Sequence, residues 1–249
     1  MILIRKHMIE YACVCAVGRV RRNNEDNFYC DGHLREDIYS NDDTVLSGVV
    51  ASDTNELFAV FDGMGGEACG EVASFVAASH AELFVRDRGS YEEYLYELAE
   101  YLNEKVTEET AARSLVLMGT TAAMLQICGD DIYILNAGDS RIYKLGAHEL
   151  RQISQDHIVP AYGGKAITKF LGMPEGSSLS PYIAMGQYKA GDLFLLCSDG
   201  VTDMLTDEEI RLILDDRRPA ADLCRTLVDT AIEKGGVDNT TAIVLRVMK

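Results

Sequence analysis

The sequence predicts an α+β fold in which helices pack against β-sheets. Short apolar segments typical of strands are spread along the chain, and segments with helical periodicity interrupt them in two blocks. This order differs from the regular strand–helix alternation that builds a parallel sheet. A chain of 249 residues can bury enough surface for one large hydrophobic core, so we expect a single domain over residues 1–249.

Runs of branched, aromatic and small apolar residues predict the strands. In order along the chain, these runs cover residues 9–17, 57–61, 120–128, 132–135, 141–145, 193–197 and 240–247. Several of them lack a polar face, which indicates strands that are covered on both sides.

Helical periodicity marks four segments between these strands. In residues 67–88, apolar and small residues recur at intervals of three and four, as in Val72, Phe75, Val76, Ser79 and Leu83. Similar spacing predicts helices over residues 91–112, 207–214 and 220–233. Residues 31–54, which are dense in Asp, Asn and Ser, and residues 172–180 are the predicted loops.

The charge balance and the cysteines exclude several classes of protein. Forty Asp and Glu residues against 23 Lys and Arg give a net charge of −17, which repels nucleic acid and attracts cations. The longest uncharged stretch, residues 114–129, is shorter than the ~18 to 20 apolar residues of a membrane-spanning helix. The N-terminus does not fit a signal peptide, and seven scattered cysteines without a CxxC pair fit neither a disulfide framework nor a zinc ribbon. We therefore expect a cytoplasmic protein with no nucleic-acid or membrane partner.

Four acidic residues stand at the ends of predicted strands. Asp62, Asp139 and Asp199 each follow an apolar run and lie beside a glycine, and Asp238 precedes the last strand. A carboxylate at the end of a buried strand costs desolvation free energy unless it is paired or bound to a metal ion. One Asp-Gly pair is an ordinary turn signal, but the repetition predicts carboxylates that meet at one end of the sheets.

The types of donor atom indicate which ions such a site takes. Oxygen ligands without a His or Cys set favour Mg²⁺, Mn²⁺ or Ca²⁺ over Zn²⁺, and the sequence has no EF-hand loop. Carboxylates that bridge two such ions form the kind of site used in phosphoryl hydrolysis. Arg21, Glu25 and Asp26 follow the first strand, where a guanidinium can bind phosphate while the acids face metal ions.

Seven short motifs carry a resemblance to a known family. They are VRxxNED at 20–26, FDGMGG at 61–66, GTT at 119–121, AGDSR at 137–141, QDH at 155–157, SDG at 198–200 and DNTTAIV at 238–244. In this order they are similar to the motifs of the metal-dependent type 2C (PPM) Ser/Thr protein phosphatases, and the DGMGG form resembles the bacterial branch. The resemblance extends over residues 14–247. It implies a four-layer αββα sandwich, in which two antiparallel β-sheets are flanked by helix pairs.

The resemblance also implies which residues bind metal. Asp62 would bridge two Mn²⁺ or Mg²⁺ ions, with the Gly63 carbonyl on one of them. Asp199 and Asp238 would complete the protein ligands of this pair. Asp139, shared with Asp199, resembles the acid that binds a third, weaker ion in bacterial members.

The implied reaction is the hydrolysis of phosphoserine and phosphothreonine in proteins. A hydroxide that bridges the two ions would attack phosphorus directly, without a phosphoenzyme. Arg21 would bind the substrate phosphate, while Glu25 and Asp26 would act through metal-bound water. The expected partners are phosphoprotein substrates and a cognate Ser/Thr protein kinase, and we expect a monomer.

The chain departs from the family pattern in three places. Met64 stands where many eukaryotic members carry a His proposed as general acid, so water would have to protonate the leaving group. Only residues 158–170 separate the QDH motif from Leu171, which predicts a short flap beside the cleft. We expect the long 31–54 segment to replace part of the cleft wall; a deletion of it that left protein-substrate kcat/KM unchanged would contradict this.

Three other interpretations fit parts of the sequence. Residues 13–19 and 15–21 both have the C-x₅-R spacing of cysteine-dependent phosphatases, although the valines between them favour a strand. Residues 63–68 fit a GxGxxA dinucleotide fingerprint, but acids stand in and beside it and the regular strand–helix alternation is missing. The third is a catalytically weak, phosphatase-like domain that acts as a phospho-dependent binding or regulatory module.

Overall fold

The computed structural model describes residues 7–64, 69–81, 90–162 and 164–248, and two large antiparallel sheets form its centre. The strand order of the first sheet is β3 (Leu46–Ala51), β1 (Met8–Ala16), β14 (Thr240–Val247), β13 (Leu193–Cys197), β8 (Arg141–Gly146) and β9 (Glu149–Gln152). The order of the second is β12 (Tyr182–Gln187), β7 (Asp131–Ala137), β6 (Ala122–Cys128), β4 (Leu57–Met64) and β2 (Asp26–Cys30), with β5 (Gly119–Thr120) paired to the end of β4.

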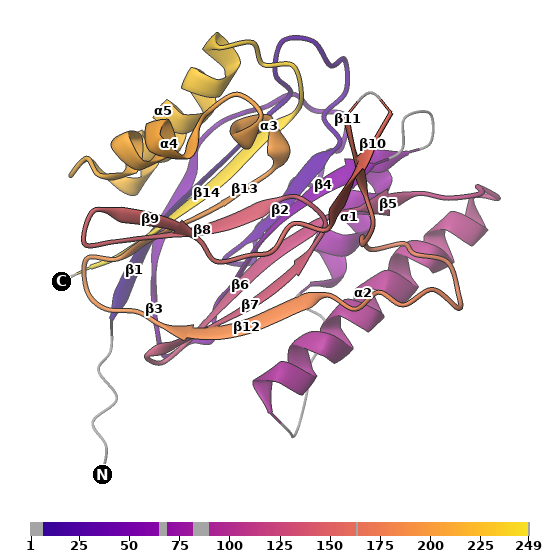
Figure 1. Ribbon diagram of the computed structural model, residues 1–249, viewed down its shortest axis with the longest axis horizontal. Coiled ribbons are helices and arrows are strands. Elements are labelled where there is room, and N and C mark those ends of the chain that lie inside the picture. Colours follow the sequence, from indigo (N-terminus) through magenta and orange to yellow (C-terminus); the bar gives the residue numbers. More distant parts are fainter. Residues whose placement is uncertain (1–6, 65–68, 82–89, 163, 249) are drawn as a thin grey trace.

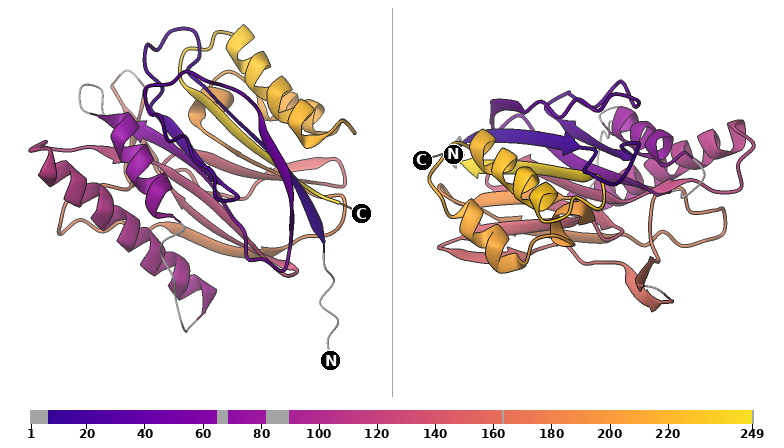
Figure 2. Two further views of the ribbon diagram at one scale, coloured as in Figure 1. Left: turned by 180° about the vertical axis from the view of Figure 1, so that it is seen from behind. Right: turned by 90° about the horizontal axis from the view of Figure 1, so that it is seen from above.

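Helices cover the outer face of each sheet (Figures 1 and 2). The second sheet carries α1 (Gly70–His80) and α2 (Tyr91–Ala112), and the first carries α3 (Asp199–Thr202), α4 (Asp207–Leu214) and α5 (Ala220–Glu233). Three hydrophobic clusters fill the spaces between the layers, one under each set of helices and one between the two sheets. This arrangement confirms the predicted four-layer αββα sandwich.

Strand β1 shows how one segment serves two of these spaces. Ala12, Val14 and Ala16 pack in the cluster beneath α5, whereas Tyr11 and Cys13 face the second sheet. Successive residues of a strand point to opposite faces, so a strand covered on both sides has no polar alternation. The continuous apolar runs of the sequence have this origin.

Local signals set the helix ends that the sequence predicted. The bounds of α2, α4 and α5 agree with the prediction. Ser90 and Thr206 begin α2 and α4 with capping boxes, in which Glu93 and Glu209 accept the N-cap amide in return. Of the helix predicted over residues 67–88, the structure describes α1 and its flanking residues Cys69 and Ala81. The remaining residues of that segment lie outside the described residues, as do Gly65 and Gly66 of the FDGMGG motif.

Several strands were missing from the prediction. Residues 31–54 are not a loop throughout, because β3 occupies part of them and pairs with β1 at the edge of the first sheet. The expected short flap is a hairpin of β10 (Ile158–Ala161) and β11 (Gly164–Ile167). These strands, like β9 and β12, are short, and none of their residues is fully buried, so they carry no strong apolar run. Within the described residues, no helix has the length and apolar character needed to cross a membrane.

Candidate metal and phosphate site

The strand directions bring the predicted site residues to one end of both sheets. Asp62 lies near the end of β4 and pairs in register with Asp26, the first residue of β2. Asp139 follows β7, Asp199 follows β13, and Asp238 precedes β14. Because neighbouring strands are antiparallel, the end of one strand lies beside the start of the next. The sheet order therefore gathers carboxylates from five separate parts of the chain.

The Asp26–Asp62 pair holds two acids close together. Directly opposed residues of antiparallel strands share a face, with Cβ atoms about 4.5–5.5 Å apart. Burial first, and then the charges of Asp26, Asp199, Asp139 and Asp238, raise the pKa of Asp62 well above its usual range. The free energy of the ionised pair is therefore high until a cation lies between them.

Asp26 is the most enclosed of these acids. Its side chain has no exposed surface, and Oδ2 accepts hydrogen bonds from Ser198 Oγ at 2.8 Å and Thr241 Oγ1 at 2.7 Å. Oδ1 has no hydrogen-bond partner among the described residues. Burial, only partly offset by the two hydroxyl groups, raises the pKa of Asp26 to about 7. One oxygen is thus fixed, and the other is left to accept a further donor.

The GTT motif fixes the backbone of Asp62. The Thr121 amide donates to the Asp62 carbonyl at 2.8 Å, and the Asp62 amide donates to Thr121 Oγ1 at 3.0 Å. Thr121 Oγ1 also lies 2.7 Å from Ser140 Oγ, which belongs to the AGDSR motif. Two separate motifs therefore position the backbone that carries this carboxylate.

Gly63 has no space for a side chain. A Cβ atom there would lie 2.2 Å from the Gly70 carbonyl oxygen and 2.5 Å from that of Glu25. The Gly63 amide donates to the Glu25 carbonyl at 3.1 Å. The close approach of these backbones explains the glycine, and the metal role of its carbonyl stays a prediction.

Arg21 is held by one of the predicted metal ligands. Its Nη2 atom lies 2.6 Å from Asp238 Oδ2, and half of the Arg21 side chain is exposed. The segment between Arg21 and Asp26 is fixed by Asn239, whose Oδ1 accepts the Glu25 amide at 2.8 Å. Asn239 also donates to the carbonyls of Val17 and Asn23. One nitrogen of the guanidinium is therefore engaged by Asp238.

Glu25 lies partly buried beside this group. Burial first, and then the charge of Glu71, raises the pKa of Glu25 above its usual range. Arg21 acts in the opposite direction. Glu25 thus lies near Arg21, as the motif predicted, and its predicted action through water stays a prediction.

A lysine occupies the place beside Asp139 where the sequence analysis expected a third ion. Lys165 Nζ, on β11, lies 2.7 Å from Asp139 Oδ2, 3.1 Å from Asp199 Oδ2 and 3.5 Å from Asp203 Oδ1. Nothing in the sequence pointed to Lys165, because it lies outside the seven motifs, on the short flap. Asp203, at the end of α3, was also missed.

The donor set fits two hard divalent ions, although the side chains are not yet arranged around them. In the described part of the chain, no three acids, cysteines or histidines stand close enough to hold an ion as they are. Lys165 contacts one oxygen of Asp199, and Arg21 contacts one oxygen of Asp238. The uncompensated Asp26–Asp62 pair and the oxygen-only donors are the features that favour Mg²⁺ or Mn²⁺.

The cysteine interpretation does not agree with the structure. Cys13 and Cys15 lie in β1 and are buried. Burial, as the largest cause, raises the pKa of Cys15 to about 11 and that of Cys13 well above its usual value. A thiol of this kind is protonated at neutral pH and is not a nucleophile.

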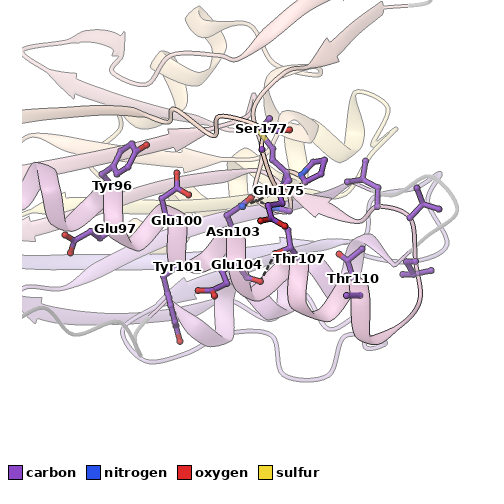
Figure 3. A pocket seen from close by; sticks show the side chains of 18 residues that line it. Tyr96, Glu97, Glu100, Tyr101, Asn103, Glu104, Thr107, Thr110, Glu175 and Ser177 are labelled. Carbon is purple, nitrogen blue, oxygen red and sulfur yellow. Dashed lines mark hydrogen bonds between the residues drawn. The ribbon is translucent and has the colours of Figure 1, made fainter.

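A large groove lies elsewhere on the molecule. It has a volume of about 990 Å³ and runs between α2 and residues 172–177 (Figure 3). Glu97, Glu100, Glu104 and Glu175 line it, and none of the predicted metal ligands does. An acidic lining repels phosphate, so this groove is not the candidate site.

The fold and the site together define a class of protein. The profile described as protein phosphatase 2C matches residues 31–237, and the chain belongs to this family. The serine/threonine protein phosphatase PstP of Mycobacterium tuberculosis is 30% identical over 263 residues, which cover 97% of this chain and 45% of PstP. The serine/threonine phosphatase Stp of Listeria monocytogenes is 26% identical, with 92% of each chain covered. The chain thus spans about half the length of PstP and nearly all of Stp.

Solved structures of similar proteins share the fold of this chain. The catalytic domain of PstP in complex with two manganese ions has a TM-score of 0.77 at 29% identity, covering 97% of this chain and 100% of that one. PppA, described as a key regulatory component of T6SS in Pseudomonas aeruginosa, has a TM-score of 0.79 at 29% identity, with 98% and 100% covered.

Proposed function

We propose that this chain is a divalent-metal-dependent phosphatase that hydrolyses phosphoserine and phosphothreonine in proteins. The observation that carries the proposal is the convergence of Asp62, Asp199 and Asp238 at one end of both sheets, beside Arg21. Membership of the protein phosphatase 2C family and the named phosphatases among its relatives support it. The PstP structure with two manganese ions supports dependence on Mn²⁺ or Mg²⁺.

Four groups would hold the two ions: the carboxylates of Asp62, Asp199 and Asp238, and the Gly63 carbonyl. When bound, the ions lower the pKa of the attacking water and neutralise charge on the phosphate. Asp199 and Asp238 first turn away from Lys165 and Arg21, which contact them in the structure described here. The reaction is direct transfer of the phosphoryl group to water.

The remaining groups of the chain position the reactants. Arg21, once released from Asp238, donates two parallel hydrogen bonds to phosphate oxygens. Asp26 accepts from a water through Oδ1, because Ser198 and Thr241 already hold Oδ2. Glu25, which lies near Arg21, orients water as well. Met64 has no proton to donate, so the leaving alkoxide takes its proton from water.

The substrates and setting follow from the same proposal. The partners are phosphoproteins and a cognate Ser/Thr protein kinase, and the chain acts as a monomer. A cytoplasmic location agrees with the cysteines, since all seven are free thiols.

The direct test is hydrolysis of a phosphothreonine peptide with Mn²⁺, with Mg²⁺ and with a chelator. Turnover that requires the ion and is lost in Asp199→Asn supports the proposal. Asp216→Asn, a surface acid paired with Arg218, is the matched control and keeps full activity. Turnover that persists in chelator rules the proposal out.

One observation favours a second candidate, a catalytically weak domain that binds phosphoproteins or regulates a partner. Lys165 and Arg21 form ion pairs with two of the predicted metal ligands, Asp199 and Asp238. Such pairing is expected in a domain that works without metal ions. Folded, Mn²⁺-saturated protein that binds a phosphothreonine peptide but does not hydrolyse it would establish this alternative.

A further inference from the structure

The β10–β11 hairpin brings a lysine into the carboxylate site. Ile158 pairs with Ile167 at its base and Ala161 with Gly164 near its tip, so Lys165 lies close to the tip on the second strand. Figure 2 shows the hairpin standing away from the two sheets, and Figure 1 shows it beside α3, which begins at Asp199. The ammonium group reaches back from the hairpin to the sheet ends.

The base of the hairpin is tied to the same strand end that carries Asp139. The His157 amide donates to the Gly138 carbonyl at 2.9 Å, and the Thr168 amide donates to the His157 carbonyl at 2.8 Å. Asp156 accepts from Arg141 at 2.8 and 2.9 Å. The QDH motif therefore anchors the hairpin beside Asp139, and the position of Lys165 follows from this anchor.

The local charges require a cation at this place. The Asp139 side chain is only 2% exposed, and its Oδ1 has no hydrogen-bond partner among the described residues. Asp199 and Asp203 bring two further negative charges to the same ammonium. The Lys165 ammonium therefore meets three carboxylates.

We propose that the Lys165 ammonium takes the place of the third divalent ion at Asp139, so that this chain binds two ions where the sequence analysis expected a possible third. The inference rests on the proposed function for the two main ions. A divalent ion on Asp139 has to approach the same carboxylate that Lys165 contacts, and like charges repel strongly at such short range in a partly buried site. The third ion can enter only if the ammonium leaves.

A tethered ammonium differs from an ion in solution. Its local concentration is set by the hairpin and does not fall when free Mg²⁺ or Mn²⁺ is low. The Asp139 carboxylate is therefore neutralised without metal. Asp62, Asp199 and Asp238, which would hold the two main ions, still respond to the concentration of divalent ions.

The test counts bound ions rather than activity. Metal-free wild type, Lys165→Met and Lys165→Arg are titrated with Mn²⁺ by calorimetry and by the electron paramagnetic resonance signal of free Mn²⁺. We expect two ions on wild type and on Lys165→Arg, which keeps the charge. Lys165→Met binds a third Mn²⁺ ion. If wild type binds a third ion at all, we expect the Kd of that ion to be at least tenfold lower in Lys165→Met.

Lys169→Met is the matched control. Lys169 lies four residues after Lys165, and its ammonium contacts the Ser178 carbonyl rather than Asp139 or Asp199. It binds two ions, as wild type does. Circular dichroism shows whether Lys165→Met is folded, and Lys165→Gln replaces it if it is not. Three ions of equal affinity on wild type and on the uncharged variant overturn the inference. Folded wild type that binds no ion overturns the proposed function as well. The number of ions on wild type therefore distinguishes a failure of the proposed function from a failure of the inference about Lys165 alone.

Discussion

The site has two sides, and both consist of aspartate side chains. Asp26 and Asp62 form one side, and Asp139 and Asp199 form the other. The negative charge of the carboxylates is balanced differently on the two sides. Asp139 and Asp199 meet the Lys165 ammonium at 2.7 and 3.1 Å. Asp26 is held only by the hydroxyls of Ser198 and Thr241, and its pKa is raised to about 7. The comparison teaches that Asp139 meets its counter-charge within the chain, whereas Asp26 and Asp62 require added cations.

The largest expected effect separates the two halves by activity. Asp62→Asn removes the carboxylate that would bridge the ions, so kcat/KM falls by about a thousandfold or more. Asp139→Asn affects the half that Lys165 neutralises, and we expect a loss of only about tenfold. Steady-state hydrolysis of a phosphothreonine peptide at saturating Mn²⁺ measures both. Equal losses in the two variants would remove the distinction.

A second effect concerns stability in the absence of metal. Asp26 has a folded-state pKa of about 7, above its ordinary value, mainly because of burial. The folded state then keeps a proton that the unfolded state releases, so the free energy of unfolding falls as pH rises from about 4 to about 7. Asp26→Asn cannot lose this proton, and at pH 8 the chelated variant is more stable than wild type by on the order of 2–4 kcal/mol.

Urea unfolding of both proteins at pH 4.5 and pH 8, with chelator, checks this prediction. The difference between the two isolates Asp26 from the many other acids of the chain. The advantage of Asp26→Asn shrinks towards pH 4.5 and disappears when Mn²⁺ is added, because only wild type gains the full binding free energy of the ions. A variant that is less stable than wild type at pH 8 in chelator contradicts the assignment.

A third effect tests the exchange of Arg21 between Asp238 and substrate. Arg21→Ala leaves the metal ligands in place but removes phosphate binding, so KM rises by about 10- to 100-fold with a smaller change in kcat. Arg22→Ala, its exposed neighbour, is the control and leaves both constants unchanged. An unchanged KM in Arg21→Ala shows that the guanidinium serves only to pair with Asp238.

The smallest effect measures the hydroxyl support of Asp26. Thr241→Val keeps the shape but removes one donor to Oδ2, which costs about 1–2 kcal/mol of stability at neutral pH. Thr107→Val removes a surface hydroxyl on α2 and costs less. Thermal unfolding in chelator compares the two, and equal shifts would show that the Thr241–Asp26 bond carries no special weight.

Much of the fold could be predicted from local patterns. Helices α2, α4 and α5 and strands β13 and β14 have the predicted bounds, because periodicity and capping boxes act between residues close in the chain. The exposed strand β3 could not be predicted in the same way, since it is defined by its pairing with β1. The hairpin strands β10 and β11 define each other in turn.

The sequence by itself determined the chemical type of the site and its order along the chain. Apolar runs that end in Asp-Gly, a guanidinium near two acids and the absence of a His or Cys set restrict the candidates to hard ions and phosphate, because donor type is a property of the residues alone. The tertiary structure decided how the charge is neutralised. Lys165 meets Asp139 and Asp199, and Ser198 and Thr241 meet Asp26, only after strands from distant segments are brought together. Electrostatic interactions of this kind depend on distances of a few ångströms, which the sheets set and the sequence motifs do not record.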